Sequence, residues 1–207
     1  MTPAEFRTLR PHLLHLTYPE NRPSIEALGL IPIGSLVARS DLPASRQRLA
    51  TSRPRPEELS LRIDGRHHAR IRDNGVMRWD RLQRCVEGLS PAAFCRLLNS
   101  HSFFWPTRDR VAKLTTARAY RTRPHLLLSV PTARLDDATL AKLHVSRINS
   151  GSTLYTPAVR GRATYRPLAE ASEREVARAA EYALRAEIPA DVIAASQWEP
   201  IAAAETP

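Results

Sequence analysis

The chain has 207 residues, of which 43% are apolar, and a formal net charge of +10. This length can bury one substantial hydrophobic core and is short for two, so we predict a single domain over residues 1–207. No stretch has the apolar length of a membrane span, and the N-terminus lacks the apolar segment of a secretory signal. We therefore expect a protein of the bacterial cytoplasm with no membrane partner.

Arginine carries almost all of the positive charge, because Lys113 and Lys142 are the only lysines. The planar guanidinium group suits phosphate, so a nucleic acid or a dinucleotide pyrophosphate would explain the excess. The codon bias of a GC-rich genome would explain it equally well. The two cysteines, Cys85 and Cys95, fall in helix-like surroundings and indicate buried thiols rather than a disulfide.

The first strong pattern in chain order is LLHLTYPENRPSIEALGL, residues 13–30. A short apolar run gives way to the helical spacing of Ile25 and Leu28, and Gly29 is typical of a helix end. The pattern predicts a strand, a tight turn and a short helix. His15 lies on this strand beside the turn, where its ring could bind a ligand hydroxyl. The alternative is a buried histidine that bonds only to the backbone.

Residues 34–58 predict short helices, with Ser35 and Pro43 as candidate starts, in a helical excursion rather than a second domain. The segment that follows, LSLRIDGRHHARIRD, alternates apolar and polar residues on either side of Asp64 and Gly65. That pattern predicts a β-hairpin.

Residues 78–99 carry two helical patterns that lead into an aromatic cluster. Strand alternation would place Phe103 and Trp105 on one face and Phe104 on the other. One face would belong to the core, and the other could stack on a flat ring. A basic helix is predicted from residue 107 to Tyr120.

Residues 125–131 form a continuous apolar run that predicts a strand buried on both faces. The turn at residues 149–152 could donate hydroxyl and N–H groups to a phosphate or ribose, although most such runs are only turns. In the C-terminal segment the composition favours helix, whereas residues 180–188 alternate like a strand. Taken alone, Glu181 would be a solvated glutamate.

The opening of the chain resembles that of DarT-like ADP-ribosyltransferases and of a related family of uncharacterised bacterial proteins. The matching positions are His15, Thr17, Asn21, Ser24, Ile25, Gly29 and Leu30. An aromatic strand and a C-terminal strand with Glu181 before Ile188-Pro189 follow in the family's order. The resemblance favours a helix to about Arg178 and then a strand. It implies an α+β, ADP-ribosyltransferase-like fold with a small bent central β-sheet flanked by helices, and a cleft for NAD between the strands of His15 and Glu181.

The resemblance also implies how such a site would work, with NAD as a substrate and no metal. Glu181 would be catalytic and would stabilise an oxocarbenium-like ribose. Arg72 is the closest match to a second catalytic position, where it would neutralise pyrophosphate or aid proton transfer; an ordinary strand-edge arginine is the alternative. The NAD-binding residues implied are His15, Thr17, Phe103 and Trp105. Arg160 and Arg162 lie in a segment close to an RGxxTY pattern of the uncharacterised family, which assigns them no role.

Transfer of a single ADP-ribose to a base of single-stranded DNA is the activity that the resemblance favours, and RNA and protein acceptors stay open. In a toxin of this kind, an antitoxin protein would be a further partner. One alternative is a catalytically inactive transferase fold used as a nucleic-acid-binding or toxin–antitoxin interaction module. Another is an NAD-using RNA 2′-phosphotransferase. The spacing of the histidines and cysteines does not favour a metal site.

Overall fold

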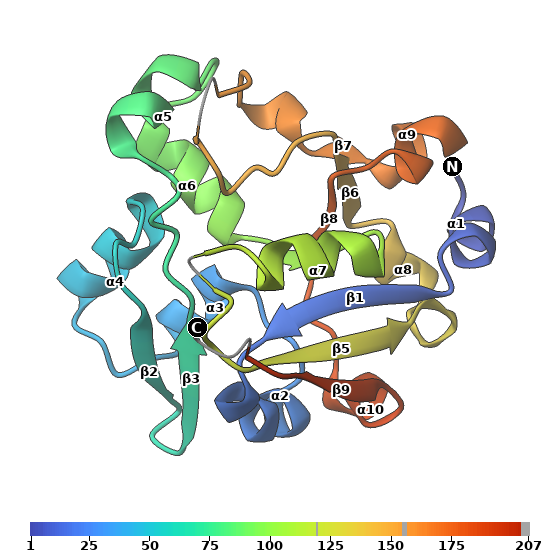
Figure 1. Cartoon of the computed structure of the whole chain (residues 1–207), viewed down its shortest axis with the longest axis horizontal. Coiled ribbons are helices and arrows are strands. Elements are labelled where there is room, and N and C mark those ends of the chain that lie inside the picture. Colours follow the sequence, from blue (N-terminus) through green and yellow to red (C-terminus); the bar gives the residue numbers. More distant parts are fainter. Residues whose placement is uncertain (119, 155–156, 204–207) are drawn as a thin grey trace.

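The computed structural model describes residues 1–118, 120–154 and 157–203. In this part of the chain three antiparallel sheets are found (Figure 1). The first has the order β1-β5-β9, with bounds His12–Thr17, His125–Pro131 and Gln197–Ile201. The second has the order β4-β8-β6-β7, with bounds Ser102–Phe104, Glu181–Leu184, Leu143–Ser146 and Arg166–Pro167. The third is the hairpin of β2 and β3, with bounds Leu59–Ile63 and His67–Ile71.

The two larger sheets meet where β1 lies beside β4. The backbone N–H of Trp105, the residue after β4, donates to the carbonyl of Leu14 at 2.7 Å, and these residues form an isolated β-bridge. In Figure 1 the strands β6 and β8 run across the direction of β1 and β5. The α+β class is therefore confirmed. Among the described residues, one β-bridge joins the two differently oriented sheets along a seam.

Helices flank the sheets. Their bounds are α1 Pro3–Leu9, α2 Arg22–Leu28, α3 Ile33–Ala38, α4 Ala44–Ser52, α5 Trp79–Cys85, α6 Pro91–Asn99, α7 Arg108–Thr115, α8 Asp137–Leu140, α9 Glu173–Ala177 and α10 Ala190–Ala194. Short 3-10 turns cover Pro19–Asn21, Thr132–Arg134, Arg162–Thr164 and Leu168–Glu170. The predicted excursion over residues 34–58 is helical, and α4 packs against α6. No helix in the described ranges is long and apolar enough to cross a membrane.

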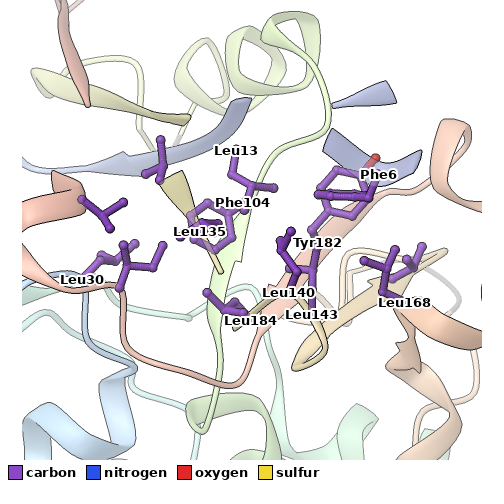
Figure 2. Close-up of a cluster of buried hydrophobic side chains, with 14 of the residues drawn as sticks. Phe6, Leu13, Leu30, Phe104, Leu135, Leu140, Leu143, Leu168, Tyr182 and Leu184 are labelled. Atoms are coloured by element: carbon purple, nitrogen blue, oxygen red, sulfur yellow. The ribbon is translucent and has the colours of Figure 1, made fainter. Parts of the chain in front are cut away.

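The main core lies between the two larger sheets and α1 (Figure 2). Phe104 and Tyr182, from the paired strands β4 and β8, are fully buried there beside Leu13 of β1. Phe6 of α1 meets the ring of Tyr182 edge-on, with 5.5 Å between the centroids. Each fully buried side chain of this size contributes roughly 1.5–3 kcal/mol relative to an exposed one. The core thus fixes β4 and β8 with one face inward and leaves the opposite face for other contacts.

The hairpin and helix α2 formed as predicted, and in each case a turn residue explains why. Asp64 and Gly65 both have positive φ and are the central residues of a tight turn, in which the N–H of Arg66 donates to the carbonyl of Ile63 at 3.1 Å. Ile63 pairs with His67, so three residues join the strands, and the positive φ values match the twist of the hairpin. Gly29 ends α2 with φ 85°, and a Cβ there would lie 2.2 Å from the carbonyl oxygen of Ile188. Leu30 and Ile188 exchange backbone hydrogen bonds of 2.9 and 3.0 Å. Gly29 therefore lets the chain after α2 approach the segment after β8.

Two predicted bounds were wrong. The basic helix ends at Thr115 rather than Tyr120, because the residues after Thr115 have no apolar period that would keep one helix face on the core. The C-terminal strand stops at Leu184, well before Ile188. Leu184 is the last residue of β8 that pairs with both neighbours, β4 and β6. Beyond it the N–H of Arg185 still donates to the carbonyl of Lys142, and Ile188 then bridges to Leu30 instead.

Candidate functional site

A cavity of about 240 Å³ opens at the seam between β1 and β4. We call it the β1–β4 cavity. Its walls come from β1, from α2 and the segment through α3, from the end of β3, from β4 and from α7, and most of the lining is apolar. The polar and aromatic residues that line it are His15, Thr17, Tyr18, Asn21, Ser24, Arg70, Arg72, His101, Ser102, Phe103 and Trp105. Five of the six predicted site residues, His15, Thr17, Arg72, Phe103 and Trp105, thus share one cavity.

His15 is held across the seam. Its Nδ1 lies 2.9 Å from the carbonyl oxygen of Phe103, so Nδ1 carries the proton and donates it. Burial lowers the pKa of His15 to about 4; the Phe103 carbonyl opposes this, and the charge of Arg72 adds to it. The ring is therefore neutral at pH 7, and its Nε2 makes no hydrogen bond with any described residue. His15 offers the cavity an acceptor for a ligand hydroxyl or amide.

Thr17 and the helix residues of the matching motif tie the cavity wall together. Asn21 Nδ2 donates to Thr17 Oγ1 at 2.9 Å and to the carbonyl of Arg70 at 2.8 Å. The backbone N–H of Arg70 donates back to Asn21 Oδ1 at 2.7 Å, and Ser24 Oγ donates to the carbonyl of His68. These contacts bind the start of α2 to β3. They account for three residues of the motif as architecture beside the cavity.

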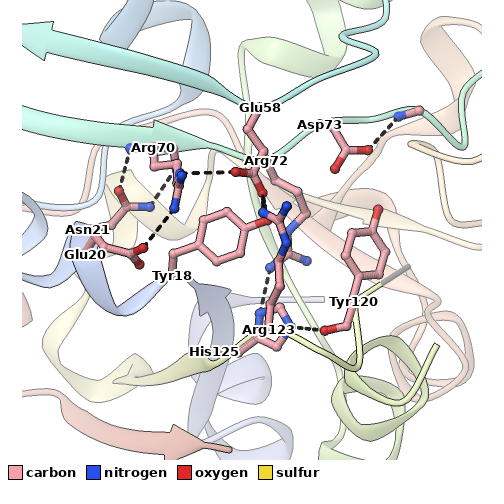
Figure 3. A network of polar contacts seen from close by, with 11 residues as sticks. Tyr18, Glu20, Asn21, Glu58, Arg70, Arg72, Asp73, Tyr120, Arg123 and His125 are labelled. Atoms are coloured by element: carbon pink, nitrogen blue, oxygen red, sulfur yellow. Dashed lines mark hydrogen bonds and ion pairs between the residues drawn. The ribbon is translucent and has the colours of Figure 1, made fainter. Parts of the chain in front are cut away.

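Arg72 lies at the rim among rings (Figure 3). Its guanidinium carbon is 5.2 Å from the ring centroid of Tyr18 and 5.0 Å from that of Tyr120. Its Nη2 lies 3.3 Å from Nδ1 of His125, whose Nε2 is 3.2 Å from the carbonyl oxygen of Tyr120. Burial, followed by the charge of Arg72, lowers the pKa of His125, so Nδ1 is an acceptor. All of these partners of Arg72 are uncharged.

The neighbouring arginines, Arg70 and Arg123, differ from Arg72 in that the carboxylate of Glu58 neutralises their charges. Arg70 Nε lies 3.1 Å from Glu58 Oε2, and Arg123 pairs with Oε1 of the same carboxylate. Tyr18 also donates its hydroxyl to Glu58, at 2.6 Å, and Arg70 has a second partner in Glu20 at 2.9 Å. Figure 3 shows this charged group beside Arg72. Of the three arginines, Arg72 is the one placed to meet an anion at the cavity.

The aromatic strand behaves as its alternation predicts. Phe104 points into the main core, whereas Phe103 and Trp105 line the cavity. His101 lies on the same face two residues earlier and was missed as a site residue, although its alternation with Phe103 could have shown it. Its Nδ1 lies 2.8 Å from the carbonyl oxygen of Leu97. Burial is the main cause that lowers the pKa of His101 to about 4, so a second neutral histidine lines the cavity.

Glu181 does not line the β1–β4 cavity, so the expectation that it faces one cavity with His15 was wrong. It is the first residue of β8 and is separated from β1 by β4. Alternation puts it on the face of Ala183, which packs in a second core against Phe94. The backbone N–H of Ser150 donates to Glu181 Oε1 at 3.1 Å. Burial raises the pKa of Glu181 to about 7, against the lowering effects of the Ser150 hydrogen bonds and of the Arg160 charge.

The predicted turn at residues 149–152 bonds to protein groups rather than presenting its donors to the cavity. Besides the contact to Glu181, Ser150 Oγ accepts a hydrogen bond from the hydroxyl of Tyr165 at 2.9 Å. Cys85 and Cys95 are buried free thiols, as expected. In the described ranges, no group of three or more His, Cys, Asp or Glu side chains is arranged to hold a metal.

Comparison with known proteins places the chain in a family. Residues 11–202 match the family of unknown function DUF7002, and the chain therefore belongs to that family. The match spans the cavity and the Glu181 strand. The chain has no match among curated proteins or solved structures.

Proposed function

We propose that this protein is an NAD-dependent mono-ADP-ribosyltransferase that modifies a nucleic acid, with a base of single-stranded DNA as the favoured acceptor. One observation carries the proposal. Residues predicted from the ADP-ribosyltransferase resemblance come from β1, from the end of the β2–β3 hairpin and from β4, and they converge on a single cavity. Most of that cavity is apolar, with a few polar groups in fixed positions, which is the usual composition of a small-molecule site.

The cavity chemistry suits the nicotinamide end of NAD. The faces of Phe103 and Trp105 can flank a flat ring, and Nε2 of His15 can accept a hydrogen bond from a ribose hydroxyl. Its volume of about 240 Å³ is below the ~300–1,000 Å³ common for drug-sized ligands, so only part of a dinucleotide would enter. The pyrophosphate would lie at the rim, where Arg72 can offer a charge-assisted hydrogen bond.

Transfer would break the bond between nicotinamide and C1′ of its ribose. The nicotinamide leaves with the bonding electron pair, the acceptor nucleophile forms the new bond to C1′, and the acceptor proton passes to a base. The sugar becomes cationic on the way, so a nearby carboxylate lowers the barrier. No aspartate or glutamate from the described ranges lines the cavity. The proposal keeps the role that the resemblance implies for Glu181, whose strand β8 pairs with β4 at the cavity wall.

The acceptor assignment has its own support. The formal net charge of +10, carried almost entirely by arginine, favours approach to a polyanion. A single strand would present unpaired bases to the cavity without the cost of opening a duplex. If the protein is a toxin, an antitoxin would act by covering this cavity.

A second candidate function is an inactive transferase fold that binds nucleic acid or an antitoxin. The observation that favours it is the position of Glu181, which is 4% exposed and bonded to Ser150 rather than lining the cavity. A carboxylate held in that way would fix the Ser150 turn rather than act on a ribose.

Labelled NAD separates the two functions. The purified protein is incubated with NAD and with separate pools of single-stranded DNA, duplex DNA, RNA and protein. We expect label in the single-stranded DNA pool with wild type, none with Glu181→Gln, and wild-type transfer with Glu173→Gln, a matched exposed glutamate. Equal transfer by Glu181→Gln would remove that residue from the mechanism. No label in any pool, with no NAD binding, would overturn the proposal in favour of the binding module.

A further inference from the structure

Arg160, whose position in the RGxxTY pattern had no assigned role, is a buried cation. It is 3% exposed and donates to five atoms, all of them uncharged. Its acceptors are the carbonyl oxygens of Asn149, Ser150, Ser152 and Ala158 and the sulfur of Cys85. An arginine side chain has five N–H donors, so all of its hydrogen-bonding capacity is used. Such an arginine fixes the turn at residues 149–152.

One peptide group lies between this cation and Glu181. The carbonyl oxygen of Asn149 accepts a hydrogen bond from Arg160 Nη2 at 3.4 Å. The N–H of the same peptide group, that of Ser150, donates to Glu181 Oε1 at 3.1 Å. The positive end of the peptide dipole therefore points at the carboxylate and its negative end at the guanidinium. The two buried charges stabilise each other through a polarised peptide, without direct contact.

Tyr165, the last residue of the pattern, connects this arrangement to the cavity wall. Its hydroxyl donates to Ser150 Oγ at 2.9 Å. Its ring stacks on His101, with 4.6 Å between centroids, and lies 6.2 Å from the ring of Phe103. His101 and Phe103 both line the β1–β4 cavity. We call the residues Glu181, Ser150, Arg160 and Tyr165 the Glu181 network.

The network opposes the protonation that burial favours. An isolated buried carboxylate becomes neutral because its charge is poorly solvated. Of the described residues, the charged or titratable groups that act on Glu181 or feel its charge are Arg160 and Tyr165, each on the chain after the Ser150 turn. Burial raises the pKa of the Tyr165 hydroxyl well above its ordinary value, so it stays protonated and remains a donor. The cation and the Ser150 N–H thus both favour the ionised carboxylate.

We propose that Arg160 is a positioning residue that, through the peptide group between Asn149 and Ser150, favours the ionised form of the Glu181 carboxylate and fixes its orientation for the ribose chemistry. This inference rests on the proposed transferase function for its purpose. The effect of Arg160 on the Glu181 carboxylate does not depend on NAD. Tyr165 supports it by fixing the side chain of Ser150.

The direct test is the titration of Glu181 itself. In protein labelled with ¹³C-glutamate, the Glu181 carboxyl resonance is assigned by its loss in Glu181→Gln and followed from pH 4 to 9. We expect a midpoint near 7 in wild type, and a rise by about one unit in Arg160→Gln, because the cation and the fixed donor are lost together. Arg162→Gln, which removes an exposed arginine two residues away, should leave the midpoint unchanged. An unchanged midpoint in Arg160→Gln would overturn the inference.

Two further measurements keep the inference testable if Arg160→Gln does not fold. In wild type, the chemical shift of the Ser150 amide proton should change with pH at the same midpoint as Glu181, and Glu181→Gln should abolish that change. A Ser150 amide shift that does not follow Glu181 would contradict the contact through the peptide group. Arg160→Lys keeps the charge with fewer donors and should give a midpoint between those of wild type and Arg160→Gln. A Lys midpoint equal to that of wild type would assign the effect to charge alone and overturn the positioning role.

Activity then reports on the function separately. The acid limb of the transfer rate against pH should move to higher pH in Arg160→Gln, together with the carboxyl midpoint, and stay in place in Arg162→Gln. If the Glu181 carboxyl midpoint shifts in Arg160→Gln but the protein transfers no ADP-ribose, the proposed function would be overturned and the role of Arg160 would stand. If Arg160→Gln transfers ADP-ribose, but neither its acid limb nor its Glu181 midpoint moves, the role of Arg160 would be overturned and the proposed function would stand.

Discussion

The β1–β4 cavity and the Glu181 network use buried polar groups in opposite ways. In the cavity, His15 and His101 are neutral, and each is held by one backbone carbonyl with the other ring nitrogen left unbonded by described residues. In the network, Arg160 uses every donor and Glu181 accepts from Ser150, so the charges are enclosed by protein. The first arrangement leaves hydrogen-bonding capacity for a ligand, and the second fixes a charge in place. A transferase needs both, and here they meet through Tyr165.

The largest effect is expected from Glu181→Gln, which removes the charge of the network and leaves the cavity intact. We expect the transfer rate to fall by roughly 10²–10⁴, the range seen when a catalytic base or one electrostatic contact is lost. NAD binding should stay within a few-fold of wild type, because no contact of the cavity changes. Single-turnover transfer and calorimetric NAD binding measure the two quantities. A parallel loss of binding would show that the two regions are not separate in function.

Low pH should destabilise the fold on the cavity side, because it protonates the neutral histidines there. Burial lowers the pKa of His101 to about 4 from an ordinary value of 6.5, so the unfolded chain takes up a proton at higher pH than the folded one. The stability that His101 contributes is therefore present above pH 6.5 and is lost as the pH falls towards 4. When the pH falls from 7 to 4.5, the unfolding free energy of wild type should therefore drop by roughly 2 kcal/mol more than that of His101→Phe.

Denaturant titrations at each pH measure this difference. His68→Gln, which changes an exposed histidine, should keep the wild-type pH dependence. An identical pH dependence for His101→Phe and wild type would mean that His101 is not held neutral.

The sequence predicted the cavity better than the network, for a physical reason. The positions of His15, Phe103 and Trp105 follow from strand alternation, which is a local property of the chain. The network instead depends on a turn folding over a strand about 30 residues later and on one peptide group joining two charges. A solvated residue was the sequence-based expectation for Glu181, and the resemblance placed it in the cavity; burial by β4, β6 and the Ser150 turn explains why neither holds.

A smaller effect is expected from Arg72→Gln, which changes the cavity rim. A hydrogen bond to a charged group contributes about 1.5–3 kcal/mol, so NAD affinity should fall by roughly 10- to 100-fold. Arg123→Gln, whose charge is already neutralised by Glu58, should change affinity much less. Equal losses in the two variants would indicate a diffuse effect of positive charge rather than a contact from Arg72. Calorimetry at two salt concentrations distinguishes these outcomes.

The smallest effect should come from His15→Phe, which keeps a ring on the seam and removes one neutral acceptor. A single uncharged hydrogen bond is worth about 0.5–1.5 kcal/mol, so NAD affinity should fall by roughly 2- to 10-fold. The Glu181 carboxyl midpoint should not move, since the substitution lies on the cavity side. A change in that midpoint would show coupling between the two regions that their separate contacts do not predict.

The three tryptophans allow the central claim, that NAD binds in the β1–β4 cavity, to be tested in one spectrum of the wild-type protein. Trp105 lines the cavity, whereas Trp79 lies under Arg53 and Trp198 under Arg22 on other elements. The measurement is an NAD titration followed by the ¹⁵N–¹H resonances of the three indoles. We predict a saturable shift of the Trp105 signal with the other two unmoved. A Trp105 signal that stays in place at millimolar NAD, or a shift confined to Trp79 or Trp198, would contradict the account.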